Sequence, residues 1–315
     1  MKMDPAVAEV RKAVRRCLDE LPAEAVVLAA CSGGPDSLAL AAALAAEAPR
    51  SGRRAGAVVV DHALQVGSAE QASRAAKACA QLGLDPVEVV TVSVHARGLG
   101  PEGAARQARH AALEEVAARV GASAIALGHT LDDQAETVLL GLGRGSGARS
   151  LAGMPRRRGL LIRPLLGVRR STTVAACAAW GLEPWQDPHN SDPRFTRSRV
   201  RSDVLPLLED VLGPGVAEAL ARTATLLRAD ADALDAWAAT VRDPSDVNVL
   251  GELPAAIRRR VIRRAAIAAG ASASALTASH VKAIEALVVD WKGQGPVTLP
   301  GGLEASRACD RLSFR

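Results

Sequence analysis

The sequence predicts an α/β fold, a doubly wound parallel sheet, with a second, mainly helical C-terminal domain that ends in a small β-meander. Three observations predict it. Up to about residue 200, short apolar runs alternate with helical patterns, as in right-handed βαβ units. From Val204 to Val241 the pattern is helical throughout, and after Val297 the apolar residues follow the shorter period of strands. We expect the domains to divide as 1–210 and 211–315.

The predicted elements of the first domain alternate along the chain. Short apolar runs predict strands over Val26–Ala30, Ala57–Val60, Val87–Val94, Ser123–Leu127 and Leu160–Arg163. Apolar residues that recur every three or four positions predict helices over Leu38–Ala48, Ala69–Leu82, Glu102–Val120, Leu131–Leu142 and Ser171–Trp180. Helices of this length between strands imply a parallel sheet with crossover connections.

The second domain is expected to be helical up to its tail. Pro206 and Gly213-Pro214-Gly215 interrupt the helical pattern, and two further helices are predicted over Ile257–Ala269 and Ser279–Val289. The meander is predicted from three short runs around a Pro-Gly-Gly turn, namely Val297–Leu299, Leu303–Ala308 and Arg311–Phe314.

The composition excludes several classes of protein. The 315 residues are 49% hydrophobic and 23% charged, which is typical of a globular chain of about two domains. No apolar run approaches the roughly 20 residues of a membrane span, and no secretory signal is evident. Five scattered cysteines without a C-x-x-C pair argue against a disulfide framework and a zinc site. We therefore expect a cytoplasmic protein without membrane contacts.

The net charge of +5 is concentrated in one stretch of the chain. Between Arg144 and Arg201, twelve arginines stand against three acidic residues, which leaves +9 there and −4 elsewhere. Such a local excess indicates a surface that binds a polyanion.

A glycine-rich loop follows the first predicted strand. The segment Cys31-Ser32-Gly33-Gly34-Pro35-Asp36-Ser37 leads directly into a helix, so paired glycines, two hydroxyls and a helix N-terminus are available for phosphate. It is neither a Walker loop nor a dinucleotide fingerprint. A plain strand-to-helix turn, capped by Asp36 and Ser37, is the structural alternative.

The string S-G-G-P-D-S resembles the loop of the PP-loop ATPases, which share a Rossmann-like fold with the adenine nucleotide α-hydrolases. The resemblance implies ATP that is cleaved between its α- and β-phosphates. On this basis the ATP-binding residues are Ser32, Gly33, Gly34, Pro35, Asp36 and Ser37, with His62 and His129 from the loops after two other strands.

An acidic motif follows the fourth predicted strand, from His129 to Thr137. Asp132, Asp133 and Glu136 are expected on the helix flank that faces away from the core, and Thr130 and Asp133 have capping-box spacing. Acidic residues in a first turn also complement the helix dipole without any chemistry. The position at the carboxyl end of a parallel strand favours a ligand site, where carboxylates can hold Mg²⁺ beside ATP.

This motif and its surroundings resemble the tRNA(Ile)-lysidine synthetase family. His-x-x-Asp-Asp-Gln-x-Glu-Thr is followed in the family's order by Arg144–Gly147 and Leu151–Met154. Further matching segments are Glu102–His110, Arg163–Leu166, Asp187–Asn190 and Arg197–Arg201, and more loosely Leu253-Pro254, Arg258–Val261 and Leu299–Gly302. His110 stands where the family usually has tyrosine. Ser198 stands where the family has asparagine, which puts in doubt how the segment Arg197–Arg201 is held.

The resemblance implies a ligase that works in two steps. ATP adenylates the C2 oxygen of the wobble cytidine in the CAU anticodon of tRNA(Ile) and pyrophosphate leaves; free L-lysine then displaces AMP to form lysidine. The codon read changes from AUG to AUA. The implied cofactors are ATP and Mg²⁺, and the implied partners are tRNA(Ile) and free lysine, while a homodimer is left open.

Four catalytic residues are implied. Asp36 and Asp132 are the expected Mg²⁺ ligands, and Asp133 is expected to orient or deprotonate the lysine amine, although the sequence does not decide between Asp132 and Asp133. Arg109 and Arg201 would stabilise charge on the phosphoryl group and the activated base, so the catalytic set is Asp36, Asp133, Arg109 and Arg201. An ion-pair ladder on the helix surface is the alternative for Arg109.

The tRNA contacts are expected from Arg144, Arg149, Arg197 and Arg199. The arginines of Arg258–Arg260 and Arg263–Arg264 are interpreted as a second grip on tRNA or as a solvated basic face. Trp180 and Trp185 are expected to pack rather than to stack on a base.

Two other functions compete. A PP-loop thiolase would need paired catalytic or cluster-binding cysteines, which the sequence does not offer. A nucleotide-sensing module of the universal-stress-protein type would account for the sheet, but not for the acidic motif or the arginine-rich stretch.

Overall fold

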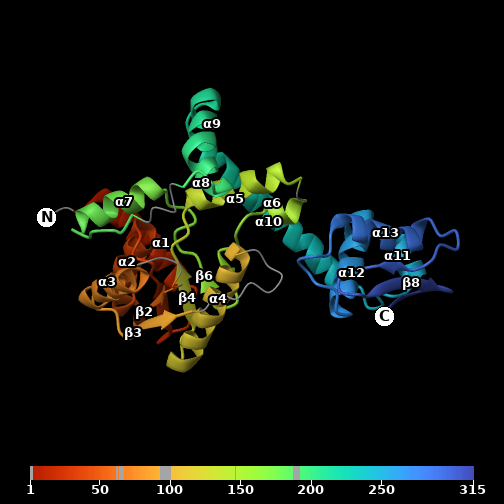
Figure 1. Ribbon diagram of the computed structural model, residues 1–315, viewed down its shortest axis with the longest axis horizontal. Helices are drawn as coiled ribbons and strands as arrows, with labels where there is room; N and C mark the ends of the chain where they lie inside the picture. Colours follow the sequence, from red (N-terminus) through yellow and green to blue (C-terminus); the bar gives the residue numbers. More distant parts are fainter. Residues whose placement is uncertain (1–2, 62, 64–66, 93–100, 146, 187–191) are drawn as a thin grey trace. The chain divides into compact units, whose positions relative to one another are not determined.

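The computed structural model describes residues 3–61, 63, 67–92, 101–145, 147–186 and 192–315, and of residues 101–106 the backbone alone. The chain forms two compact units, Met1–Leu226 and Leu227–Arg315 (Figure 1). The boundary between them falls inside helix α10, Val216–Ala239. The functional division at residue 210 stays a prediction. No helix in the described part of the chain is long and apolar enough to cross a membrane.

The first unit holds a six-stranded sheet in the order β3-β2-β1-β4-β6-β5. Its strands are β1 Val26–Ala30, β2 Arg54–Asp61, β3 Val87–Thr91, β4 Ala124–Leu127, β5 Arg157–Arg158 and β6 Leu161–Ile162. All neighbours are parallel except β5, which pairs antiparallel with β6. The chain moves from β1 to β2 and β3 on one side and returns to β4 on the other, so the loops after β1 and β4 flank the switch point of the sheet, where such folds bind ligands.

Helices cover both faces of this sheet. Up to Leu212, the helices of the first unit are α1 Pro5–Leu18, α2 Pro35–Glu47, α3 Ser68–Gln81, α4 Pro101–Val120, α5 Leu131–Gly143, α6 Ala148–Leu151, α7 Arg170–Ala179, α8 Thr196–Arg199 and α9 Leu205–Leu212, with a 3-10 turn at Pro49–Ser51 and a π-helical turn at Val200–Val204. Alternate residues of β1 point to opposite faces: Val27 and Ala29 join the core formed with α1, α2, α3 and α7, whereas Leu28 joins the core formed with α4.

Helix α1 was not predicted, although its signals are present in the sequence. Asp4 accepts hydrogen bonds from the first backbone N–H groups, and Pro5 occupies the first helical position. The buried face of α1 joins the main core. Arg11 and Arg15 each donate to the carboxylate of Glu47, at 2.6 and 2.7 Å, and thereby tie α1 to the end of α2.

The second unit comprises helices packed against a small sheet. After α10 come α11 Val247–Glu252, α12 Ala255–Ala268 and α13 Ala278–Val289, followed by β7 Val297–Thr298, β8 Glu304–Ala308 and β9 Arg311–Phe314. The three strands pair antiparallel in sequence order, so the predicted β-meander is confirmed.

Most predicted elements are present with small shifts of their ends. The strand predicted over Val87–Val94 ends at Thr91, and its last two predicted positions lie outside the described residues. The predicted helical region after Val204 consists of α9 and α10, which are separated at Gly213. Besides α1, the short elements α6, β5, α8 and α11 were not predicted, because segments of two to six residues carry no recognisable period.

Candidate functional site

The glycine-rich loop is shaped by hydrogen bonds within itself. Gly33 adopts a left-handed φ of 83°, and Gly34 precedes α2 as its N-cap. The Ser37 hydroxyl donates to the Gly34 carbonyl oxygen at 2.9 Å and accepts from the Ser32 backbone N–H at 3.1 Å. The Trp185 backbone N–H donates to the Gly33 carbonyl oxygen at 2.9 Å. The loop is therefore ordered around the N-terminus of an α-helix, where backbone N–H groups favour an anion.

The end of β4 lies directly against this loop. A Cβ atom on Gly128 would come within 3.0 Å of the Asp36 carbonyl group and of the Ser37 backbone nitrogen, so only glycine allows this approach. The acidic motif, which begins at the next residue, therefore starts beside the first turn of α2.

The capping box predicted from the sequence opens α5. The Thr130 backbone N–H and hydroxyl donate to Oδ2 of Asp133, at 2.8 and 2.9 Å, and the Asp133 N–H points back to the Thr130 hydroxyl. These bonds fix the Asp133 carboxylate and leave its Oδ1 for a partner from another segment.

Arginines from two later segments meet the carboxylates of α5. Glu136 is fully buried, and its oxygens accept from Nε of Arg197 and Nε of Arg201, both at 2.7 Å. Arg170 adds a third guanidinium, with its Nη1 3.4 Å from Glu136 Oε1 and its Nη2 2.8 Å from Asp133 Oδ1. Three guanidinium groups thus surround this buried carboxylate and form charge-assisted contacts with it.

Arg170 also contacts Asp36 at the end of the glycine-rich loop. Its Nε donates to Asp36 Oδ2 at 3.1 Å, and the Thr173 hydroxyl, one turn further along α7, donates to Asp36 Oδ1. The Arg170 backbone N–H donates to Asp132 Oδ2 at 2.7 Å, so Asp132 anchors the N-terminus of α7. The side chain of Arg170 thus joins the two motifs that the sequence singled out.

The same cluster shifts the pKa values of its two central aspartates in opposite directions. Burial raises the pKa of Asp36 above its ordinary value, and Arg170 and Thr173 offset this only in part. Burial would also raise the pKa of Asp133, but Arg170 and the Thr130 N–H outweigh it, so the pKa of Asp133 lies below its ordinary value. Although burial opposes it, the surrounding carboxylates raise the pKa of Arg170, which therefore stays charged. Opposite shifts on adjacent acids are typical of functional sites.

One prediction about this motif is wrong. Asp133 and Glu136 were expected on an outward-facing flank, yet they are 8% and 0% exposed. They do turn away from the apolar stripe of α5, but α7 and the segment from α8 to the π-helical turn supply the arginines that cover this flank. Arg170 and Thr173 are site residues that the sequence reasoning missed, and Glu136, although named in the acidic motif, was given no role.

His129, the first residue of the acidic motif, is hydrogen-bonded to Arg163. Nε of the buried Arg163 donates to its Nδ1 at 3.3 Å, and Nη1 of Arg163 donates to the Pro155 carbonyl oxygen at 2.9 Å. His129 therefore lies at the carboxyl end of β4, next to Gly128 and the nucleotide loop. His62, the other predicted nucleotide contact, lies outside the described residues.

Comparison with known proteins places these motifs in a family. A PP-loop domain model matches residues 7–208, and a TilS substrate binding domain model matches residues 246–313. A tRNA(Ile)-lysidine synthase from Thermobifida fusca is 59% identical over 96% of this chain and 95% of its own. The chain belongs to the tRNA(Ile)-lysidine synthase family. A second member, from Salinispora tropica, is 55% identical over 98% of this chain and 96% of its own. The chain is accordingly a tRNA-modifying ligase with a PP-loop, and tRNA(Ile) is its partner.

A solved structure confirms the fold. The U34-tRNA thiolase NcsA from Methanococcus maripaludis, determined with its [4Fe-4S] cluster, is 21% identical, with a TM-score of 0.59 over 71% of this chain and 80% of that one. In the lysidine synthase chain, four of the five cysteines are buried and all five are free. Among the described residues, no three His, Cys, Asp or Glu side chains are grouped to hold a metal ion.

The donors near the PP-loop fit Mg²⁺ in the manner in which it binds nucleotides, through one or two carboxylates together with phosphates. Asp36 lies in the first turn of α2, and its carboxylate is partly exposed. Both candidate carboxylates already have partners. Asp36 accepts from Arg170 and Thr173, whereas Asp132 accepts from the Arg170 N–H and lies 3.5 Å from the Arg169 guanidinium, so Mg²⁺ would replace a partner at either one.

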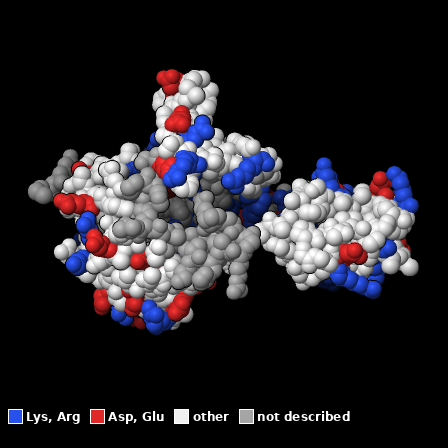
Figure 2. Space-filling model, in the orientation of Figure 1, with Lys and Arg blue, Asp and Glu red and all other residues white. Residues whose placement is uncertain are grey.

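The predicted tRNA arginines of the lysidine synthase chain divide into two groups. Arg144, Arg149 and Arg199 are exposed, whereas Arg197 is half-buried on Glu136. Figure 2 shows basic side chains gathered over α6 and α8 of the first unit. Arg109 is exposed on α4, and its catalytic role stays a prediction.

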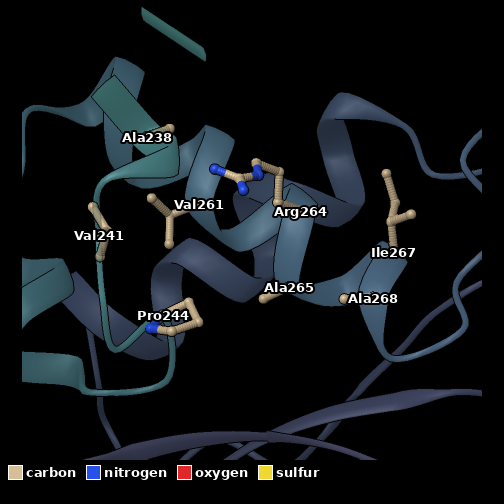
Figure 3. A pocket seen from close by; sticks show the side chains of 8 residues that line it. All are labelled: Ala238, Val241, Pro244, Val261, Arg264, Ala265, Ile267 and Ala268. Atoms are coloured by element: carbon tan, nitrogen blue, oxygen red, sulfur yellow. The ribbon is translucent and has the colours of Figure 1, made fainter. Parts of the chain in front are cut away.

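A shallow apolar groove of about 410 Å³ lies in the second unit (Figure 3). It is lined by Ala238, Val241, Pro244, Val261, Arg264, Ala265, Ile267 and Ala268. Arg264 is the one charged residue of this lining, and it is exposed. It makes no hydrogen bond or ion pair with the described part of the chain.

Proposed function

We propose that this lysidine synthase adenylates the wobble cytidine of tRNA(Ile) at its PP-loop and joins free L-lysine to it at the acidic motif. One observation carries the proposal: the Arg170 guanidinium contacts both Asp36 of the PP-loop and Asp133 of the acidic motif. Asp36, which would serve the nucleotide, and Asp133, which would serve the amine, therefore bind the same side chain. Two consecutive reactions on one base require their groups to lie this close together.

In the first step, the C2 oxygen of the cytidine attacks the α-phosphorus of ATP. The bond from this phosphorus to the β-phosphate oxygen breaks, and pyrophosphate leaves. Ser32, Gly33, Gly34, Pro35 and Ser37 would hold the departing pyrophosphate at the N-terminus of α2. Asp36 would hold Mg²⁺, which screens the charge of the triphosphate when it is bound. His129 would contact the nucleotide from the end of β4.

In the second step, the ε-amine of lysine attacks C2, the bond from C2 to the AMP oxygen breaks, and AMP leaves. Asp133 would receive the amine proton, and its low pKa suits a carboxylate that is ionised when the ammonium arrives. Glu136, buried in the same cluster, would add a second negative charge near the ammonium. Arg201 and Arg109 would stabilise charge on the phosphoryl group and the activated base.

Exposed arginines would bind the phosphates of the anticodon arm. Arg144, Arg149 and Arg199 are accessible for this role, and an anticodon loop offers its base without melting a duplex. In the second unit, Arg264 over its apolar groove is the best-placed cation for a further tRNA contact. We expect the reaction to take place in the cytoplasm.

The proposal is tested by following the two steps separately, with pyrophosphate release for adenylation and mass analysis of tRNA nucleosides for lysidine. Pyrophosphate release should require a tRNA with a CAU anticodon. Asp36→Ala should abolish release while tRNA binding survives. Asp133→Asn should retain release and lower lysine transfer by about 10²–10⁴-fold, since it removes the proton acceptor.

Asp210→Asn provides the matched control, because Asp210 is exposed on α9, and both steps should remain normal in this variant. Release that does not depend on the anticodon would contradict the proposed substrate. Full lysine transfer by Asp133→Asn would remove Asp133 from the second step.

A further inference from the structure

Arg170 binds three carboxylates from two motifs, one in the PP-loop and two in the acidic motif. Its Nε lies 3.1 Å from Asp36 Oδ2, its Nη2 lies 2.8 Å from Asp133 Oδ1, and its Nη1 lies 3.4 Å from Glu136 Oε1. Its hydrogen bonds thus join the PP-loop to the acidic motif through one side chain. Any ligand that moves this guanidinium therefore changes both sites.

The cluster is balanced in charge. Three carboxylates, those of Asp36, Asp133 and Glu136, are paired with three guanidinium groups, those of Arg170, Arg197 and Arg201. An ammonium group that enters a balanced cluster meets no surplus negative charge, and each carboxylate that could bind it already holds a guanidinium. Lysine must therefore displace an arginine, unless another ligand has done so first.

A triphosphate at the PP-loop would compete for Arg170. Asp36 lies in the first turn of α2, so the guanidinium that binds it also lies beside the helix N-terminus where phosphate is expected. Guanidinium groups bind phosphate oxygens through paired, charge-assisted hydrogen bonds, which are stronger than neutral ones. As Arg170 turns toward phosphate, Asp133 and Glu136 lose one positive partner and gain capacity for an ammonium.

The other arginines are not placed for this exchange. Arg197 and Arg201 bind Glu136 and Asp133 but not Asp36, and Arg169 binds Asp132, Glu209 and Glu218. Arg170 is anchored by its own backbone N–H on Asp132, at 2.7 Å, while its side chain is 21% exposed. The backbone is thus fixed, while part of the side chain is open to solvent.

We propose that Arg170 is a positioning residue that couples the two sites: bound nucleotide draws its guanidinium away from Asp133 and Glu136 and thereby opens the site for the lysine ammonium. This inference rests on the proposed function, because it takes ATP and lysine as the two ligands. It gives the reaction an order, with lysine bound productively only after the nucleotide.

The test measures lysine affinity by calorimetry, with and without an ATP analogue whose α- and β-phosphorus atoms are joined by a methylene group. The native chain should bind lysine roughly 5- to 150-fold more tightly with the analogue, the usual range of coupling between two sites. In Arg170→Gln, lysine should bind without the analogue at least as tightly as in the native chain, and the ratio should fall to about one, since no guanidinium remains to be displaced.

Two further variants separate coupling from structural support. Arg169→Gln removes the same charge at the same helix end, but Arg169 does not contact Asp36, Asp133 or Glu136, so the coupling ratio should persist. Arg170→Lys keeps the charge on a compact ammonium that cannot bridge three carboxylates, and its ratio should lie between those of the native chain and the glutamine variant. Thermal melting confirms that each variant is folded.

A native ratio near one overturns the inference without any variant. An unchanged ratio in Arg170→Gln, with both affinities weakened together, overturns it as well and assigns Arg170 a structural role. If Arg170→Gln does not fold, Arg170→Lys takes its place. A ratio of lysine affinities in Arg170→Lys that equals the native ratio then overturns the inference. If the native chain binds no lysine under either condition, this inference fails, and the lysidine assay then shows whether the proposed function fails with it.

Discussion

The ionised carboxylate of Asp36 lowers the stability of the folded protein. Burial raises its pKa, so its ionised form is less stable in the folded chain than in the unfolded one, despite the hydrogen bonds from Arg170 and Thr173. The pKa of Asp133, which binds the same arginine, lies below its ordinary value, so Asp133 is instead stabilised as an anion. A carboxylate whose pKa is raised in this way is a candidate for a functional role, as we propose for Asp36.

Asp36→Asn should therefore give a free enzyme at least as stable as the native one at pH 7, although adenylation is lost. The sign follows from the raised pKa: the penalty of Asp36 is present when the carboxyl is ionised and disappears as the pH falls below the pKa of an ordinary aspartate. The advantage of the variant should thus shrink toward pH 3–4, which thermal melting across pH measures. A variant less stable than the native chain at pH 7 and equally so at low pH would show that Asp36 is chiefly a structural ligand of Arg170.

The residues of the site were only partly predictable from the sequence. The PP-loop, the capping box and Asp133 follow from local patterns, because their partners lie within a few residues. Arg170 and Glu136 do not, because their partners lie 34 or more residues away along the chain. A helical wheel shows that Glu136 turns from the apolar stripe of α5, but it does not show what covers that flank.

At the scale of elements, most arginines of the basic helix α12 are bound to other residues of the second unit. Arg258 and Arg259 bind the buried carboxylate of Glu285 on α13, at 2.9 and 2.6 Å. Arg260 binds Asp235, and Arg263 donates to the carbonyl oxygens of the loop before α13. Four of the five arginines of α12 thus hold the second unit together, and their role as a tRNA grip stays a prediction.

Glu285→Gln should destabilise the second unit, because it leaves two guanidinium groups without their carboxylate. Breaking a buried pair in this way typically costs about 3–5 kcal/mol, although the exposure of Arg259 reduces its share. Urea unfolding monitored in the second unit should show the loss. Glu304→Gln is the control, since Glu304 is an exposed residue of β8, and equal losses in the two variants would contradict the structural role of Glu285.

Arg264→Ala should leave the stability of the second unit nearly unchanged and weaken tRNA binding. Arg264 is exposed, and removing it breaks no hydrogen bond or ion pair within the described chain, so stability should change by less than about 0.5 kcal/mol. Affinity for tRNA should fall, because its guanidinium is available for phosphate or for stacking on a base. Filter binding with tRNA(Ile) measures this; unchanged affinity would exclude the groove from the tRNA interface.

At the scale of the whole molecule, the charge of the arginine-rich stretch is smaller on the surface than in the sequence. Five of its twelve arginines are used inside the first unit, namely Arg163, Arg169, Arg170, Arg197 and Arg201. Seven are exposed, namely Arg144, Arg149, Arg156, Arg157, Arg158, Arg194 and Arg199. Of these, Arg194 pairs with Asp192 and Arg199 lies near Asp203. The composition predicts a polyanion surface, but only the fold separates arginines that build the site from arginines that face the solvent.

The exposed group should determine how tRNA binding responds to salt. Each phosphate contact releases condensed counterions, so the logarithm of the affinity falls with the logarithm of the salt concentration by about 0.7–0.9 per contact. The double variant Arg144→Gln, Arg149→Gln should lower this slope by about 1.4–1.8 if both residues bind phosphate. Arg74→Gln is the matched control, because Arg74 is exposed on α3 and outside the arginine-rich stretch, and its slope should equal that of the native chain. Arg197→Gln should behave differently from both: it removes a partner of the buried Glu136, so it should impair lysine transfer while changing the salt slope little. A native slope in the double variant would exclude Arg144 and Arg149 from the phosphate contacts.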